Sequence, residues 1–180
     1  FVGSRGLGDV YKRQQIDSEI IFEWSNLECP YVKRHYGSNN MQTTQKFAKS
    51  KNVIWITVIS SAEGKQGYIQ PNDAVNTFAS FGSFPDHILV DENGDLGKKF
   101  NAKTTPHIFI ADKNKNIVYQ GAIDDAGGSK FWTTDLNQST NFVKKVINDI
   151  KSNKPLSVSK TRPYGCSVKY LSLIHISEPT

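Results

Sequence analysis

The chain has 180 residues, a formal net charge of +5 and 37% hydrophobic residues, a composition typical of one globular domain. It has no run of five or more basic residues, so we expect no nucleic-acid binding. No apolar stretch approaches the ~20 residues of a membrane span, so we expect no membrane insertion. Its two cysteines, Cys29 and Cys166, are too few for a disulfide scaffold. The cysteines and the four histidines show no metal-ligand spacing, and we expect neither a metal nor a cofactor.

Both ends of the chain lack the periodicity of structural elements. Residues 1–14 and 171–180 resemble translated sequencing-adapter peptides, and we interpret both as artefacts outside the fold. The domain is therefore expected over residues 15–170. The chain begins with Phe1 and not with methionine, so we expect its true N-terminus to be missing. The compartment, cytoplasmic or periplasmic, stays open.

The hydrophobic pattern predicts alternating strands and helices. Short apolar runs indicate strands, and apolar residues at helical spacing indicate helices. In chain order we expect a strand at 20–24, a helix at 30–50 broken near 37–40, a central strand at 53–60, a short helix at 72–81, a strand at 87–90, helical turns at 96–100, a hairpin of 107–111 and 117–120, and an amphipathic helix at 134–152. This order predicts an α/β layer architecture with an antiparallel hairpin at one edge.

Cys29 and Pro30 stand where the first predicted strand leads into the first helix. Proline favours the first helical position, so we expect Pro30 there and Cys29 at the N-cap. A sulfur at the N-cap faces unpaired N–H groups and the positive end of the helix dipole, which favour the nucleophilic thiolate. Lys33 adds positive charge one turn further on, and Glu28 opposes it. Cys29 is thus the candidate nucleophile, and the alternative is a buried structural cysteine.

Cys166 lies in the tail that follows the last predicted helix, and we expect this tail to be free to fold back. Residues 26–32 contain no second thiol that could pair locally with Cys29. We therefore predict a reversible disulfide between Cys29 and Cys166, which requires their Cα atoms to come within about 7 Å. The alternative for Cys166 is a free surface thiol or an intermolecular partner.

Two histidines and one acidic segment were considered as further site candidates. His35 lies six residues beyond Cys29, about 240° around the helix, so we expect a surface or packing role and no catalysis. His107 follows Pro106 directly, and a packing role is expected there too. The acidic run at 91–95 lacks the glycine that a calcium loop needs at its sharp turn, and it predicts a plain turn.

The element order, together with three motifs, resembles the thioredoxin fold and, within it, the redoxin or peroxiredoxin-like group. The motifs are the strand leading into residues 28–32, the run from 91 to 121 that includes Thr104-Thr105-Pro106, and the tail at 161–170. The resemblance covers about residues 17–170. It implies an α/β fold with a central mixed sheet flanked by helices and with the family's opening strands missing. It also implies a cis bond before Pro106, beside the active cysteine.

The chain departs from two signatures of this group. A dithiol thioredoxin has a second cysteine three residues from the first, where this chain has Asn26 and Val32. A standard peroxiredoxin has proline and threonine seven and three residues before its cysteine, where this chain has Phe22 and Asn26. From the sequence, no arginine can be assigned to Cys29.

The resemblance implies a peroxiredoxin-like, thiol-dependent oxidoreductase of bacterial type with an antioxidant role. Cys29 attacks a peroxide or a protein disulfide, Cys166 resolves the product, and an external thiol restores the reduced form. Pro30, Thr105 and Pro106 are the expected substrate contacts. The alternative is a non-catalytic thioredoxin-fold binding module, in which Cys29 is structural and the loop of Thr105 and Pro106 docks a partner peptide.

Overall fold

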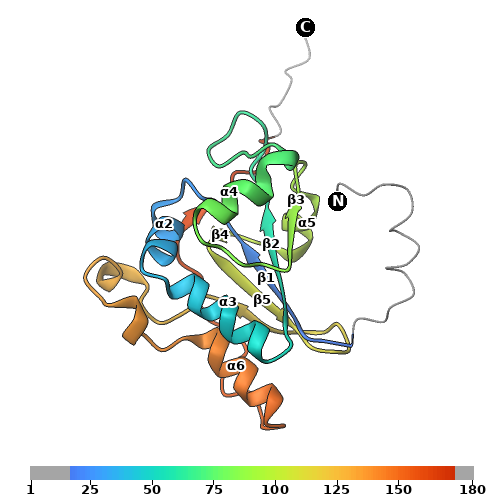
Figure 1. Ribbon diagram of the computed structural model, residues 1–180, viewed down its shortest axis with the longest axis vertical. Coiled ribbons are helices and arrows are strands. Elements are labelled where there is room, and N and C mark those ends of the chain that lie inside the picture. Colours follow the sequence, from blue (N-terminus) through green and yellow to red (C-terminus); the bar gives the residue numbers. More distant parts are fainter. Residues whose placement is uncertain (1–16, 173–180) are drawn as a thin grey trace, which may run out of the picture.

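The computed structural model describes residues 17–172, and within them five strands form one mixed sheet (Figure 1). The strand order is β3-β2-β1-β5-β6. β1 pairs in parallel with β2, and β2 pairs in parallel with β3, whereas β5 runs antiparallel to both β1 and β6. The strands span β1 Ile20–Trp24, β2 Ile54–Ile59, β3 His87–Val90, β5 His107–Ala111 and β6 Ile117–Gly121.

The central strand of the sheet is β1, whereas the sequence pattern predicted this position for β2. β2 is an interior strand with a neighbour on each side. The prediction missed the centre because β1 carries Glu23, whose charge makes this strand read as less apolar. In the structure Glu23 is fully buried, so β1 is covered on both faces.

The helices lie on both faces of the sheet. They span α2 Pro30–Gly37, α3 Asn40–Ser50, α4 Ala74–Ser80, α5 Asp95–Phe100 and α6 Phe142–Lys151. Side chains alternate between the faces of a strand, so Ile21 joins the core beneath α2, α3 and α6, whereas Trp24 and Phe109 join the core shared with α5. The predicted break at 37–40 and the hairpin at 107–121 are confirmed, and the acidic segment forms a turn closed by Gly94 N–H bonding to Asp91 O at 3.0 Å.

The amphipathic helix predicted at 134–152 is shorter than expected and begins at Phe142. Asn141 is its N-cap: the side-chain oxygen accepts a hydrogen bond from Lys144 N, and the side-chain nitrogen donates to Thr44 Oγ1 at 2.8 Å. Leu136 lies in a separate 3₁₀ turn and packs with Phe131 in a small cluster of its own. The apolar spacing continued across the cap, and the pattern therefore concealed the break.

The tail after α6 folds back onto the body of the protein, as expected, and it is held there. A short strand, β7 (Cys166–Ser167), pairs antiparallel with β4 (Thr104–Thr105) to form a second, two-stranded sheet (Figure 1). The pairing continues on the far side, where Val168 N–H bonds to Lys103 O at 3.1 Å. Upstream, Thr161 N–H bonds to Gln120 O of β6 at 3.0 Å. Backbone hydrogen bonds therefore fix the tail on both sides of Cys166.

The predictions for residues 1–14 and for 173–180 lie outside the described residues, as does the prediction of missing opening strands. No helix in the range 17–172 is long and apolar enough to cross a membrane.

Candidate active site

Cys29 occupies the N-cap of α2, with backbone angles φ −70° and ψ 125°, and Pro30 is the first helical residue. The Cys29 carbonyl accepts the first bond of the helix from Lys33 N at 2.9 Å. This local arrangement is the one that the sequence predicts. The Cys29 side chain is fully buried, with 0% of the residue exposed, while Pro30 lies at the surface.

The loop that precedes β5 lies directly beside Cys29. The Thr105–Pro106 bond is cis, and Cys29 Sγ lies 3.2 Å from Thr105 O. The cis bond and the position of the loop, both implied by the resemblance, are confirmed. Thr105 and Pro106 are buried, so in this state a substrate meets them only when the tail above them moves.

Cys166 lies against Cys29, although the two are 137 positions apart in the sequence. Their Sγ atoms are 2.7 Å apart, and both cysteines are free. The β4–β7 pairing creates this proximity because its register sets Cys166 opposite Thr105. Gly165 makes the approach possible: its φ of +144° disfavours a side chain, and an added Cβ would lie 2.1 Å from Thr105 O.

The two thiols differ in their surroundings. Cys166 is partly exposed, and burial, followed by the hydrogen bond and charge of Cys29, raises the pKa of its thiol to about 11, against a smaller opposing effect of Lys169. Cys166 therefore keeps its proton at neutral pH. Within hydrogen-bond reach of the Cys29 sulfur, this proton can stabilise negative charge on Cys29.

The segment that leads into Cys29 is fixed by the neighbouring loop. The Asn26 side chain accepts a hydrogen bond from Glu28 N at 2.9 Å and donates one to Gln66 O at 3.3 Å. The Glu28 carboxylate accepts a bond from Gly67 N. Asn26 stands where a standard peroxiredoxin has threonine, and here its amide already serves the loop.

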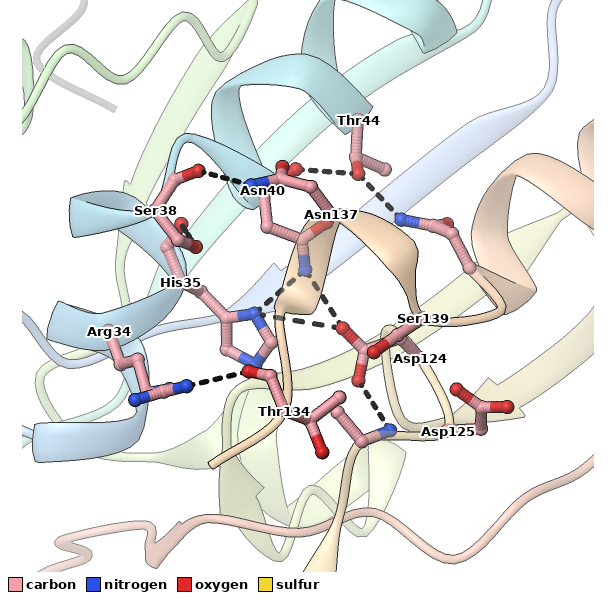
Figure 2. A network of polar contacts seen from close by, with 12 residues as sticks. Arg34, His35, Ser38, Asn40, Thr44, Asp124, Asp125, Thr134, Asn137 and Ser139 are labelled. Atoms are coloured by element: carbon pink, nitrogen blue, oxygen red, sulfur yellow. Dashed lines mark hydrogen bonds and ion pairs between the residues drawn. The ribbon is translucent and has the colours of Figure 1, made fainter. Parts of the chain in front are cut away.

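Arg34, one turn beyond Cys29, is occupied elsewhere. Its guanidinium donates to the Trp132 carbonyl at 3.0 Å and to the Thr134 carbonyl at 2.7 Å (Figure 2), and it lies over the ring of Phe131 at 5.2 Å. Arg34 thus holds the loop after β6 against α2. It does not supply the guanidinium that the sequence left unassigned.

A cavity of about 690 Å³ opens beside the cysteine pair. Gly165 and Thr104, which directly precede Cys166 and Thr105 in the chain, form part of its wall, and Tyr31 continues it at the start of α2. The rest of the lining comes from the loop after β6, from the start of α6 and from the tail: Asp124, Asp125, Gly127, Gly128, Phe142, Thr161, Arg162, Pro163 and Tyr164. A ligand in this cavity would therefore lie next to the tail strand that carries Cys166.

The two histidines have packing roles, as expected. His35 is fully buried and lies 3.0 Å from Asn40 Nδ2 (Figure 2). Burial, followed by the charge of Arg34, lowers the pKa of His35 to about 3. His107 accepts a hydrogen bond from Lys103 N at 3.1 Å, and burial lowers its pKa to about 4. Both rings are neutral at physiological pH.

Four residues that shape this site were not predicted from the sequence. Asn40, Asp124, Tyr164 and Gly165 connect the tail to the body of the protein. Asp124 lies in the loop after β6, and Tyr164 lies in the tail motif at 161–170, and neither position indicated a role at the site. The one available signal was the glycine directly before Cys166, which indicates a close backbone approach. Among residues 17–172, no group of three or more His, Cys, Asp or Glu residues is placed to hold a metal ion.

The fold and the site define a thioredoxin-like protein that carries a non-local cysteine pair. The family model described as Redoxin matches residues 14–134. This is more than half of the chain, so the protein belongs to the Redoxin family, and a thiol-redox function in general follows from that membership. The resemblance to redoxins is thereby confirmed.

Solved structures confirm the thioredoxin-like fold. A hypothetical protein from Sinorhizobium meliloti superposes with a TM-score of 0.71 at 17% identity, covering 88% of this chain and 82% of that one. An uncharacterised conserved protein from Geobacillus kaustophilus gives 0.71 at 20% identity, covering 86% and 78%. A thioredoxin-like protein solved in its oxidised form gives 0.51 at 17% identity, covering 77% and 81%. The comparison with curated proteins finds no match.

Proposed function

We propose that the protein is a thiol-dependent oxidoreductase that cycles between a Cys29/Cys166 dithiol and a Cys29–Cys166 disulfide. The observation that carries this proposal is the 2.7 Å separation of the two sulfurs. The chain belongs to the Redoxin family. It combines a buried cysteine at a helix N-terminus with a second thiol in contact. Such a pair of thiols is suited to two-electron exchange.

Cys29 is the nucleophile in this proposal, and Cys166 is the resolving thiol. The Cys29 thiolate attacks one sulfur of a substrate disulfide, which forms a mixed disulfide and releases the first substrate thiol. Cys166 then attacks the Cys29 sulfur and releases the second. The substrate gains two electrons and two protons, and the protein is left with the Cys29–Cys166 bond. An external dithiol reverses the change and is itself oxidised to a disulfide.

The position of the two sulfurs is consistent with this division of roles. The helix N-terminus supports negative charge on Cys29, both during attack and when Cys29 leaves. As long as β7 is paired with β4, Cys166, with its raised pKa, is protonated. It is also the more exposed of the pair, and an incoming reductant therefore meets its sulfur first.

A disulfide fits the site better than a peroxide does. Attack on a peroxide would give a Cys29 sulfenic acid and one water or alcohol, and condensation with Cys166 would release a second water. That reaction benefits from polar donors beside the nucleophile that polarise the O–O bond. Here the Asn26 amide is committed to its loop, and the Arg34 guanidinium to Trp132 and Thr134.

Thr105 and Pro106, with Pro30 at the rim, form the proposed substrate contacts. β7 covers both Cys29 and the backbone of Thr105. A substrate that reaches Cys29 therefore replaces β7, and an extended protein segment containing a cystine can do so by pairing with β4. This assigns the substrate class as a protein disulfide in an extended segment.

Cysteine variants test the proposal and separate it from a non-catalytic binding module. Wild-type, Cys29→Ser and Cys166→Ser proteins are compared for reduction of a protein disulfide in the presence of an external thiol, and for consumption of hydrogen peroxide. We expect Cys29→Ser to lose all activity. Cys166→Ser should form a mixed disulfide with the substrate and then stop.

Mass spectrometry after oxidation and non-reducing digestion should show the Cys29 and Cys166 peptides linked within one chain. Turnover by Cys29→Ser equal to wild type would refute the role of Cys29. Absence of the linked peptide would refute the role of Cys166. Peroxide consumption faster than disulfide reduction would reverse the choice of substrate.

A further inference from the structure

Tyr164, two residues before Cys166, is a tail side chain that packs against α2. Its ring lies 5.4 Å from the ring of Phe131 and 6.0 Å from that of His35. Gly127 leaves the space for it, since a Cβ at that position would lie 2.5 Å from Tyr164 Cδ1. The ring therefore occupies a slot between α2 and the loop after β6.

The hydroxyl of Tyr164 joins a buried polar cluster that consists of His35, Asn40, Asp124 and Tyr164 itself. The Tyr164 hydroxyl donates to Asp124 Oδ1 and lies 3.2 Å from His35 Nε2. Asn40 Nδ2 lies 2.8 Å from Asp124 Oδ2 and 3.0 Å from His35 Nδ1. Figure 2 shows how Asn40 stands between His35 and Asp124.

The donors and acceptors of this cluster match completely when His35 is neutral. The two Asn40 amide protons serve Asp124 and His35 Nδ1, which makes Nδ1 an acceptor and places the ring proton on Nε2. That proton is donated to the Tyr164 oxygen, whose own proton goes to Asp124. The low pKa of His35 agrees with this arrangement. Burial, followed by the charge of Asp124, raises the pKa of Tyr164, so the hydroxyl keeps its proton.

Three members of the cluster belong to the body of the protein, and only Tyr164 belongs to the tail. His35 is in α2 and Asn40 begins α3. Asp124 is fixed by the N–H of Ala126 at 3.1 Å and by a bridge to Asn141. The three body residues thus form a hydrogen-bonding site for one hydroxyl of the tail.

We propose that Tyr164 is a positioning residue, whose hydroxyl, held by Asp124 and His35, keeps Cys166 within reach of Cys29. The inference rests on the proposed function of the cysteine pair. β7 contains only two residues, and so short a pairing gives the backbone bonds around Cys166 little stability of their own. The anchor lies one residue upstream of Gly165, where the chain turns toward Thr105, and it therefore fixes the point from which Cys166 is presented.

The test is the rate at which iodoacetamide alkylates Cys29 in reduced Tyr164→Phe protein. Cys29 is fully buried beneath β7, so the reagent reaches it only when the tail detaches. The Tyr164 hydroxyl is bonded to a buried carboxylate while both thiols are free, so its loss should favour detachment and raise the alkylation rate by up to about tenfold. A rate within twofold of wild type would overturn the proposal.

Tyr170→Phe is the matched control, because it removes another tail hydroxyl, on the far side of Cys166, that bonds to Ala102 O at 2.7 Å. We expect its Cys29 alkylation rate to stay within about twofold of wild type. An equal shift in both variants would show that any tail contact suffices and would overturn the specific role of Tyr164. Circular dichroism of both proteins checks that the fold is kept.

Asp124→Asn provides an independent second variant, and the double variant tests whether the two side chains act together. We expect Cys29 in the protein that combines Asp124→Asn with Tyr164→Phe to be alkylated no faster than in the faster single variant. Additive effects would contradict a shared contact. A wild-type protein that forms no Cys29–Cys166 disulfide would refute the proposed function itself. A normal wild-type disulfide with no effect of Tyr164→Phe refutes only the anchor.

Discussion

Two buried carboxyl groups organise the polar interior of this protein, and they differ in what they hold together. Glu23 accepts hydrogen bonds from Trp55 Nε1 at 2.9 Å, Thr57 Oγ1 at 3.1 Å and Tyr36 Oη at 3.1 Å. All of these partners lie in the sheet or in α2. Asp124, only 1% exposed, is bonded by Asn40 and by Tyr164 of the tail.

The difference shows how the same chemical group can serve the whole fold or one segment. The Glu23 contacts break only when the sheet separates from α2, which is global unfolding. The Asp124 contacts include one that breaks when the tail detaches, which is a local opening with a lower free-energy cost. We therefore expect changes at Glu23 to act on the whole molecule and changes around Asp124 to act mainly on the tail.

The largest effect is expected for Glu23→Ala. This change removes the acceptor for four buried donors, Gln45 Nε2 at 3.4 Å included, and leaves a cavity, so the free energy of unfolding should fall by at least about 3 kcal/mol. Asp124→Ala should lower the free energy of unfolding by less than half as much, because the tail can detach and expose the Tyr164 hydroxyl to water. Urea unfolding measures both values. Equal losses would remove the distinction between the two groups.

A pH titration of stability gives the next largest effect. Burial lowers the pKa of His35 to about 3 from the ordinary 6.5, so the unfolded chain binds this proton more readily than the folded protein does. The stability due to a neutral His35 is complete above pH 6.5 and falls as the pH decreases toward about 3, by at most about 1.4 kcal/mol per pH unit. His35→Gln should lack this slope, which urea unfolding at a series of pH values measures.

Glu23→Gln is the control for this titration because it removes a dependence of the opposite sign. Burial raises the pKa of Glu23 above its ordinary 4.5, so the folded protein binds this proton more readily. Its contribution is greatest at low pH and is lost as the pH rises above about 4.5. The two variants should thus change the pH dependence in opposite directions. A His35→Gln protein that keeps the wild-type slope would place the acid sensitivity elsewhere.

The smallest effect on global stability is expected for Gly165→Ala. The added Cβ collides with the Thr105 carbonyl, so β7 must leave β4, but the loss is limited by the free energy of detaching the tail, about 1 kcal/mol or less. Alkylation of Cys29 by iodoacetamide should become faster, because its cover is gone. Gly64→Ala is a matched control, since Gly64 also has a positive φ of +76° but open space around it. Unchanged protection of Cys29 in Gly165→Ala would contradict the role of β7 as its cover.

The sequence predicts most of the fold because its elements follow local rules. Periodicity located the strands and most helices, and the Cys29-Pro30 pair defined the start of α2 through the geometry of a helix N-terminus. The loop containing Pro106 was placed by family resemblance. The error at 134–152 arose because the cap at Asn141 depends on Thr44 in another helix. Such a contact leaves no trace in local spacing.

The position of the tail could be predicted only in part. The presence of just two thiols suggested that the tail folds back and that Cys166 meets Cys29, but the sequence did not indicate which contacts hold the tail there. What fixes the tail is a set of long-range contacts: the pairing with β4, the slot at Gly127 and the cluster around Asp124. Each depends on residues that are distant in sequence and individually unremarkable.

Because β7 pairs with β4, it competes with any external strand for the same edge of β4. A strand that pairs with Thr104–Thr105 from outside can bind only in the fraction of molecules whose tail has left, and its apparent dissociation constant is the intrinsic one divided by that fraction. If detaching the tail costs about 1 kcal/mol, the tail is detached in about one molecule in six, and external strands bind about sixfold more weakly than the bare edge would allow. Oxidation to a Cys29–Cys166 bond would reduce that fraction further. Affinity for partners would then depend on the redox state of the chain.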